Sequence, residues 1–190
     1  MPNQKNHPQR QSIRLQEFDY AQSGAYFVTV VCHKRMNLFG EISDGELNLN
    51  RAGEIVEQTW LEIPKHFPNV NSDIFVIMPN HVHGIIKIVN DIPVRARHAS
   101  PQRFNNEKPQ SKRHNGVKPQ SVGTIIGSFK SAVTKQLHGT KIINKEKIWQ
   151  RNYYEHIIRD EDDYHQIADY IETNPLNWEY DRDNPEHIEP

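Results

Sequence analysis

Two histidines that alternate along one short segment have the clearest potential for chemistry in this chain. His81 and His83 belong to the run Met-Pro-Asn-His-Val-His-Gly-Ile-Ile at positions 78–86. On a β-strand, residues i and i+2 point to the same face, so the two imidazoles would lie side by side and could chelate one divalent ion. Gly84 is expected to leave room beside them. The alternative is a solvated strand face, because a chain with eleven histidines can contain such a pair by chance.

The last predicted helix carries a tyrosine and an asparagine at the edge of its apolar face. With about 100° of rotation per residue, that face consists of Tyr164, Ile167, Ala168 and Ile171. Tyr170 and Asn174 are four residues apart and lie together at its edge. A phenol there could reach across to the sheet, with an amide oxygen beside it available to a cation. An ordinary boundary tyrosine fits equally well, and spacing does not exclude the competing tyrosines Tyr153, Tyr154 and Tyr164.

Segments rich in β-branched and aromatic residues supply the strands that would position the histidines. The run at 26–32 is typical of a central strand, and Asp44-Gly45 lies between two short apolar runs like the turn of a hairpin. Pro79-Asn80 predicts a tight connection just before the histidine pair. The other predicted strands are 38–42, 46–49, 74–78 and 82–89.

Capping residues mark the starts of the predicted helices. Asn50 precedes the first helix, whose apolar residues recur at helical spacing until Pro64, and Ser121 precedes the second. Acidic residues at 160–163 favour the N-terminus of the last helix, which should end at Asn174-Pro175. The segment 148–158 is aromatic and irregular. This order of elements predicts an α+β fold, with helices packed on a mainly antiparallel sheet.

Charge is unevenly distributed along the chain, whose 190 residues and 35% hydrophobic content predict one domain over 1–190. The net charge is only -1, but positions 153–190 hold twelve acidic residues against two basic ones, Arg159 and Arg182. The remaining residues hold twelve acidic against twenty-one basic. The body of the protein is therefore basic, which permits a phosphate-bearing partner, although solvation alone would explain either block.

Two polar regions are not expected to form packed elements. Residues 1–20 predict a polar N-terminal arm, and about 90–120 predict a flexible basic insertion with four prolines. The candidate DNA-binding residues are two in this insertion and two on the helix that follows it: Lys112, Arg113, Lys130 and Lys135.

The single cysteine and the hydropathy pattern indicate the compartment. Cys32 excludes an internal disulfide and a cysteine-built zinc site, and it stands in an apolar run as a small buried hydrophobe. No stretch approaches the ~18 apolar residues of a membrane span, and positions 1–16 lack a signal-peptide centre. We therefore expect a cytoplasmic protein without membrane contact.

Several segments resemble the bacterial REP-associated tyrosine transposases of the HUH class. Pro-Asn-His-Val-His-Gly-Ile-Ile at 79–86 is similar to their metal motif, and Asp-Tyr-Ile-Glu-Thr-Asn-Pro at 169–175 is similar to the helix that carries their nucleophile. The resemblance extends over most of the chain, including 20–31, 38–42, 127–134 and 154–159. The basic insertion departs from the shortest members of the family.

This resemblance implies a fold, a reaction and a set of site residues. It implies a ferredoxin-like sheet with helices on one side, and Tyr170 as the nucleophile that forms a 5′-phosphotyrosine with single-stranded or REP-like hairpin DNA. His81, His83 and Asn174 would hold Mg²⁺ or Mn²⁺, with Asn174 the weaker ligand because it is uncharged. The protein would be a monomer or homodimer.

Two other classes of protein compete with this interpretation. A histidine-triad hydrolase would need a third histidine where Ile85 stands, which argues against it. A domesticated protein that binds DNA hairpins without cutting them would keep the same residues, so the sequence leaves that alternative open.

Overall fold

A computed structural model describes residues 21–89, 120–144 and 146–186. The predicted N-terminal arm and nearly all of the predicted insertion, with Lys112 and Arg113, lie outside these ranges.

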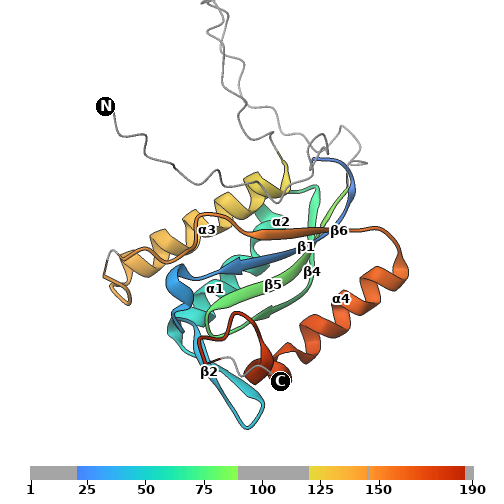
Figure 1. Ribbon diagram of the computed structural model, residues 1–190. Coiled ribbons are helices and arrows are strands. Elements are labelled where there is room, and N and C mark those ends of the chain that lie inside the picture. The colour runs from blue at the N-terminus through green and yellow to red at the C-terminus, as the bar shows by residue number, and fades with distance from the viewer. Residues whose placement is uncertain (1–20, 90–119, 145, 187–190) are drawn as a thin grey trace, which may run out of the picture.

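Four antiparallel strands form the main sheet, in the order β4-β5-β1-β6 (Figure 1). β1 (Gly24–Val31) pairs along its whole length with β5 (His81–Ile88), so Val31 faces His81 and Thr29 faces His83. β4 (Val70–Ile77) and β6 (Tyr154–Ile158) complete the sheet. With its two crossover helices, the chain runs β1-α1-β4-β5-α3-β6, which is the ferredoxin-like arrangement. The prediction of an α+β fold with a mainly antiparallel sheet is confirmed.

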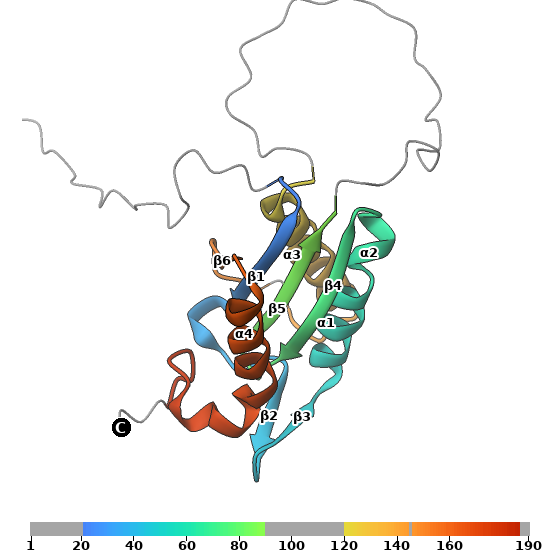
Figure 2. The same cartoon turned by 90° about the vertical axis from the view of Figure 1, so that its right-hand side faces the viewer.

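Helices cover both faces of this sheet (Figure 2). α1 (Arg51–Leu61), the short α2 (Ile63–His66) and α3 (Val122–Gly139) lie on one face, whereas α4 (Glu161–Thr173) lies on the other. The expectation of helices on one side therefore holds for α1 to α3 but is wrong for α4, whose Ile171 packs on Phe27 and Ile85. Of the helices in the described ranges, none is long and apolar enough to cross a membrane.

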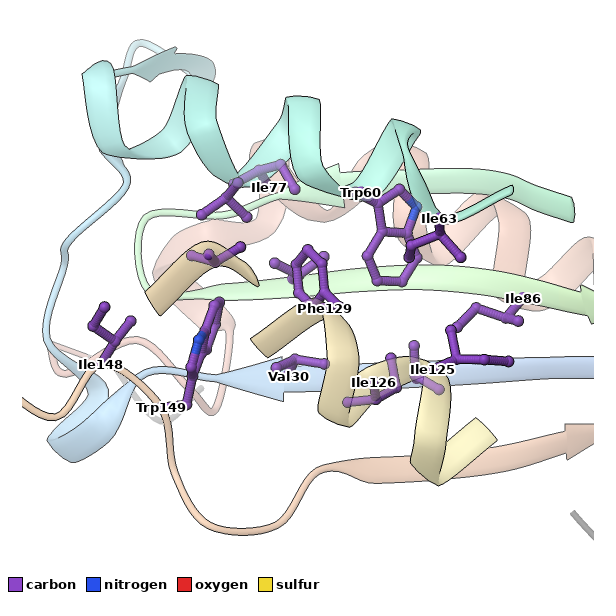
Figure 3. Close-up of a cluster of buried hydrophobic side chains, with 14 of the residues drawn as sticks. Val30, Trp60, Ile63, Ile77, Ile86, Ile125, Ile126, Phe129, Ile148 and Trp149 are labelled. Carbon is purple, nitrogen blue, oxygen red and sulfur yellow. The ribbon is translucent and has the colours of Figure 1, made fainter. Parts of the chain in front are cut away.

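The larger core layer lies between the sheet and helices α1 and α3 (Figure 3). Trp60 contacts the ring of Phe129 edge to face, and Val30 and Ile86 point into this layer from the strands. Cys32 is fully buried in it, as predicted, and burial raises the pKa of its thiol. Bulky side chains from both crossover helices therefore cover the face of β5 that is opposite the histidines.

Gly84 has a different role from the one predicted. It shares the α1/α3 face with Val82 and not the face of the histidine pair, because side chains alternate along β5. A Cβ at this position would lie 2.4 Å from Cζ2 of Trp60. The glycine therefore makes room for the indole in the core.

Local signals correctly predicted where the helices begin, whereas the first one ends at Leu61, before the predicted Pro64, which lies inside α2. The Asn50 side chain accepts hydrogen bonds from the backbone N–H groups of Ala52 and Gly53, and Ser121 caps α3 by accepting from Thr124. The Asp160 side chain caps the start of α4 by accepting from the backbone N–H of Asp163. At the other end, α4 is followed directly by a 3-10 helix, Asn174–Tyr180.

The predicted hairpin is confirmed as β2 (Gly40–Ser43) and β3 (Glu46–Leu49), which form their own two-stranded sheet. One other prediction needs correction. The segment 148–158, predicted to be irregular, contains the edge strand β6 paired with β1. β6 was missed because all five of its residues are partly exposed, so its sequence shows no alternation of apolar and polar residues.

Candidate active site

The two histidines of β5 are buried together on the face that α4 covers. His81 is fully buried and His83 is 2% exposed, and their Nε2 atoms are 2.9 Å apart. Strand alternation sends both side chains to this face, while Val82 between them enters the opposite core layer. The imidazoles therefore present their Nε2 atoms to one shared point.

The residue before the pair determines which nitrogen of His81 carries the proton. The Asn80 amide nitrogen donates to the carbonyl oxygens of Arg35 (3.0 Å) and Asp183 (2.7 Å), which orients the amide. Its Oδ1 lies 2.8 Å from Nδ1 of His81 and can only accept, so Nδ1 carries the hydrogen. The lone pair of neutral His81 is therefore on Nε2. The Thr29 hydroxyl lies 2.9 Å from Nδ1 of His83, and this hydrogen bond orients the second ring.

Asp181 brings a carboxylate to the same point from the far end of the chain. Its Oδ2 lies 4.0 Å from Nε2 of His81, and the ligand atoms of Asp181, His81 and His83 all lie within 4.8 Å of one another. Its Oδ1 accepts from the backbone N–H of Asp183 at 2.6 Å, which fixes the carboxylate. The sequence analysis missed Asp181, since nothing in its local pattern distinguishes it from the other acidic residues at this end of the chain.

Asn174 lies beside this carboxylate at the end of α4. It is buried, and its Nδ2 donates to Oδ2 of Asp181 at 3.2 Å. Its Oδ1 is also buried but has no hydrogen-bond partner among the described residues. An unpaired buried amide oxygen is costly, so its presence fits a site that is completed by a bound cation.

Tyr170 is the tyrosine whose hydroxyl reaches the histidines. Its oxygen lies 3.2 Å from Nε2 of His83, and its ring stacks edge to face on Phe27. The hydroxyls of the competitors Tyr164 and Tyr153 donate elsewhere, to Asp73 and Glu155 respectively, each at 2.6 Å. The Tyr154 ring lies near Phe27 and lines the same pocket as Tyr170.

Burial keeps the side chains of His81, His83 and Tyr170 neutral near pH 7. Burial lowers the pKa of His81 to about 4, against the opposing effect of the Asp181 and Asp183 carboxylates. Burial, followed by the proximity of His81, holds the pKa of His83 well below its usual value. Burial also raises the pKa of Tyr170 to about 12, so its phenol is protonated. Neutral imidazoles are the form that binds metals.

A pocket of about 440 Å³ opens beside these buried groups. Its walls come from β1, β6, α4 and the segment after α4, and they combine aromatic rings with amides, one carboxylate and one guanidinium: Phe27, Thr29, Tyr154, Tyr170, Asn174, Asn177, Tyr180, Asp181 and Arg182. Tyr170, which is 44% exposed, thus lines this pocket although the histidines are buried.

The donor set fits a divalent cation. The ligand atoms of two imidazoles and a carboxylate lie within 4.8 Å of one another, and the neighbouring Asn174 has an unpaired buried amide oxygen. Such a mixture of nitrogen and oxygen ligands suits several divalent metals. The orienting hydrogen bonds that the remote imidazole nitrogens form with Asn80 and Thr29 are those expected around metal-binding histidines.

The two candidate DNA-binding lysines described by the structure are on α3, across the sheet from the histidines. Lys130 donates to the carbonyl oxygens of Gln150 (2.9 Å) and Asn152 (3.0 Å), and burial lowers its pKa to about 8. Lys130 therefore holds the segment that leads into β6. Lys135 is exposed to solvent.

Comparisons with known proteins give relatives in sequence and similar solved structures. An uncharacterized protein of Haemophilus influenzae is 43% identical over 173 residues, covering 91% of this chain and 92% of the relative. A protein of the same organism named as a putative REP-associated tyrosine transposase is 25% identical over 170 residues, covering 85% of this chain and 76% of its own length. No family model matches the chain.

One similar solved structure is that of a REP-associated tyrosine transposase bound to a REP hairpin. It has a TM-score of 0.51 at 18% identity, covering 90% of this chain and 77% of the other. This likeness confirms the fold.

Proposed function

We propose that this chain is a member of the REP-associated tyrosine transposase family and that it cleaves and rejoins DNA strands through a covalent bond to Tyr170. The observation that carries the proposal is the approach of the Tyr170 hydroxyl to within 3.2 Å of Nε2 of His83. The proposed nucleophile, Tyr170, thereby lies directly beside the proposed metal site. An ordinary boundary tyrosine has no reason to contact a buried pair of neutral imidazoles.

The proposed substrate is single-stranded or hairpin DNA. The relative named as a putative REP-associated tyrosine transposase, and the similar structure with its bound REP hairpin, support this choice. The pocket supports it too, because aromatic walls suit nucleobases and a guanidinium suits a phosphate.

We propose that Tyr170 attacks the scissile phosphorus. The phenol oxygen forms the new P–O bond, the bond from phosphorus to the 3′ oxygen breaks, the phenol proton passes to solvent and the 3′ oxygen takes up a proton. The product is a 5′-phosphotyrosine and a free 3′ hydroxyl, and attack by another 3′ hydroxyl restores the phosphodiester and Tyr170. The phosphotyrosine bond replaces a phosphodiester bond, so the rejoining step needs no ATP.

The residues proposed to hold Mg²⁺ or Mn²⁺ are His81, His83, Asn174 and, from the structure, Asp181. A bound cation supplies Lewis-acid polarisation of a phosphate oxygen. The chain itself keeps both imidazoles neutral by burial and orients them through Asn80 and Thr29. It also positions the Tyr170 oxygen beside them.

The test is covalent capture of DNA by Tyr170 variants. The parent is incubated with 5′-labelled and 3′-labelled hairpin oligonucleotides, with and without Mn²⁺, and adducts are resolved on a denaturing gel. We expect a metal-dependent adduct that disappears in Tyr170→Phe while hairpin binding persists, because only the nucleophilic oxygen is removed. The matched controls Tyr153→Phe and Tyr164→Phe should both retain the adduct, since their hydroxyls bind carboxylates outside the pocket.

Other outcomes would redirect the proposal. Loss of the adduct in Tyr154→Phe but not in Tyr170→Phe would move the nucleophile to the other side of the pocket. Hairpin binding without any adduct from the parent would favour the non-catalytic DNA-binding alternative. Retention of full activity in a His81→Ala, His83→Ala double variant would refute the metal site.

A further inference from the structure

Arg182 stands between two buried aspartates whose side chains turn inward. The Asp181 carboxylate faces His81 and Asn174, while that of Asp183 accepts from Nε of Arg35 at 2.9 Å. The backbone carbonyl of Asp183 also accepts from the Asn80 amide at 2.7 Å. Hydrogen bonds thus hold the backbone in place on both sides of Arg182. Asp181 and Asp183 are buried, whereas Arg182 is exposed.

The fixed backbone directs the Arg182 side chain to the pocket that holds Tyr170. The central carbon of its guanidinium lies 5.7 Å from the centroid of the Tyr154 ring, in the range of a cation–π contact. Tyr154 and Tyr170 line the same pocket, so the guanidinium lies in the pocket that Tyr170 also lines.

The charge of Arg182 is exceptional for its surroundings. Positions 153–190 contain twelve acidic residues and only two basic ones, of which Arg159 lies at the end of β6, outside the pocket lining. Arg182 is the one cationic side chain among the residues that line this pocket, and Asp181 beside it would repel a phosphate. Its charge also acts at the site, since it lowers the pKa of Tyr170 against the effect of burial.

We propose that Arg182 binds the scissile phosphate and stabilises the negative charge that develops on its oxygens as Tyr170 attacks. This inference rests on the proposed function and adds to it a residue outside the histidine and tyrosine motifs. A guanidinium suits the task because its planar donors match two phosphate oxygens and it stays charged in a partly buried pocket. The inward-facing aspartates hold Arg182 in place before the substrate arrives, which lowers the cost of ordering it.

The test compares Arg182→Ala, Arg182→Lys and the control Arg159→Ala on two versions of one hairpin oligonucleotide. One version has a normal scissile phosphate, and the other has an uncharged methylphosphonate at that position. Adduct formation is followed under single-turnover conditions, with the melting temperature and Mn²⁺ affinity of each variant measured in parallel. On the normal phosphate, we expect Arg182→Ala to react about 10²–10³-fold more slowly, the usual cost of losing one donor to developing charge. Arg182→Lys should be intermediate and Arg159→Ala should match the parent.

The methylphosphonate separates contact with the phosphate from a merely structural role. Arg182→Ala and the parent should react with it at similar rates, because the charge that Arg182 neutralises is absent. Equal losses on both substrates, or a lowered melting temperature or Mn²⁺ affinity that accounts for the loss, would overturn the assignment. So would unchanged reaction on the normal phosphate. A parent that forms no adduct with the normal oligonucleotide would instead overturn the proposed function, and this assignment with it.

Discussion

His81 shows how a proposed metal ligand depends on a neighbouring residue that is not itself a proposed ligand. Its neutral form has its lone pair on Nε2 because the Asn80 amide, oriented by two carbonyl groups, accepts from Nδ1. This hydrogen bond selects the tautomer of His81 that carries its hydrogen on Nδ1, so the ring is already in the form that could bind an ion. Asn80 is a positioning residue for the site, and its sequence position next to His81 brings its amide within reach of the ring.

We therefore expect Asn80→Ala to weaken Mn²⁺ binding by about 10–100-fold, the usual cost of removing an orienting partner of a metal-binding histidine. Isothermal titration calorimetry well below the melting temperature measures this effect. Asn71→Ala, at an exposed position of β4, is the matched control and should bind Mn²⁺ like the parent. Equal Mn²⁺ affinities in both variants would show that Asn80 does not orient His81.

At the scale of the element, β5 contributes side chains to both faces of the sheet. His81 and His83 point towards α4, while Val82 and Ile86 enter the core under α1 and α3. Gly84 lies on this second face, where Trp60 occupies the space of its missing side chain. The core layer under α1 therefore supports the strand that carries the histidines.

Replacement of Gly84 by alanine should destabilise the fold by about 1–3 kcal/mol, because the added methyl group would overlap the Trp60 indole. Urea denaturation followed by tryptophan fluorescence measures the change. Gly127→Ala offers a control with the opposite sign: its Cβ would meet nothing within 4 Å on an exposed face of α3, so a stabilisation of about 0.5–1 kcal/mol is expected. If Gly84→Ala proved as stable as the parent, the packing of Trp60 against β5 would be wrong.

At the scale of the whole molecule, the charges divide between a basic body and an acidic C-terminal region. The active-site pocket lies where the acidic region folds back onto the sheet, and α3 with Lys135 lies on the opposite face. A hairpin that occupies the pocket and also reaches Lys135 must extend past the edge of the sheet. Lys130 is held by two carbonyl groups, which leaves Lys112, Arg113 and Lys135 as the proposed contacts to distant phosphates.

Hairpin binding should weaken steeply with salt, because these basic residues release counterions from the DNA phosphates. Each of Lys112→Gln, Arg113→Gln and Lys135→Gln should reduce the slope of log K against log salt by about one unit for the phosphate contact it removes. Fluorescence anisotropy over a salt series measures the slopes. Lys65→Gln on α2 removes an exposed lysine outside the proposed set and should leave the slope unchanged. Salt-independent binding would refute an electrostatic mode of recognition.

Local patterns were sufficient for the features that depend on neighbours in sequence. Strand alternation predicted that His81 and His83 share a face, and the capping residues Asn50 and Ser121 predicted where α1 and α3 begin. Periodicity also placed Tyr170 and Asn174 together at the edge of α4. These properties follow from backbone geometry over a few residues, so a single sequence contains them.

Only the tertiary structure decided which distant residues meet. Tyr170 contacts a histidine 87 positions earlier in the chain, and Asp181 and Arg182 join the site because the 3-10 helix after α4 turns the chain back. The face of the sheet that α4 covers, the neighbour of Gly84 and the pairing of β6 depend on the same long-range packing. Such contacts are selected by the burial of whole apolar faces against one another, and no short stretch of sequence specifies the partner face.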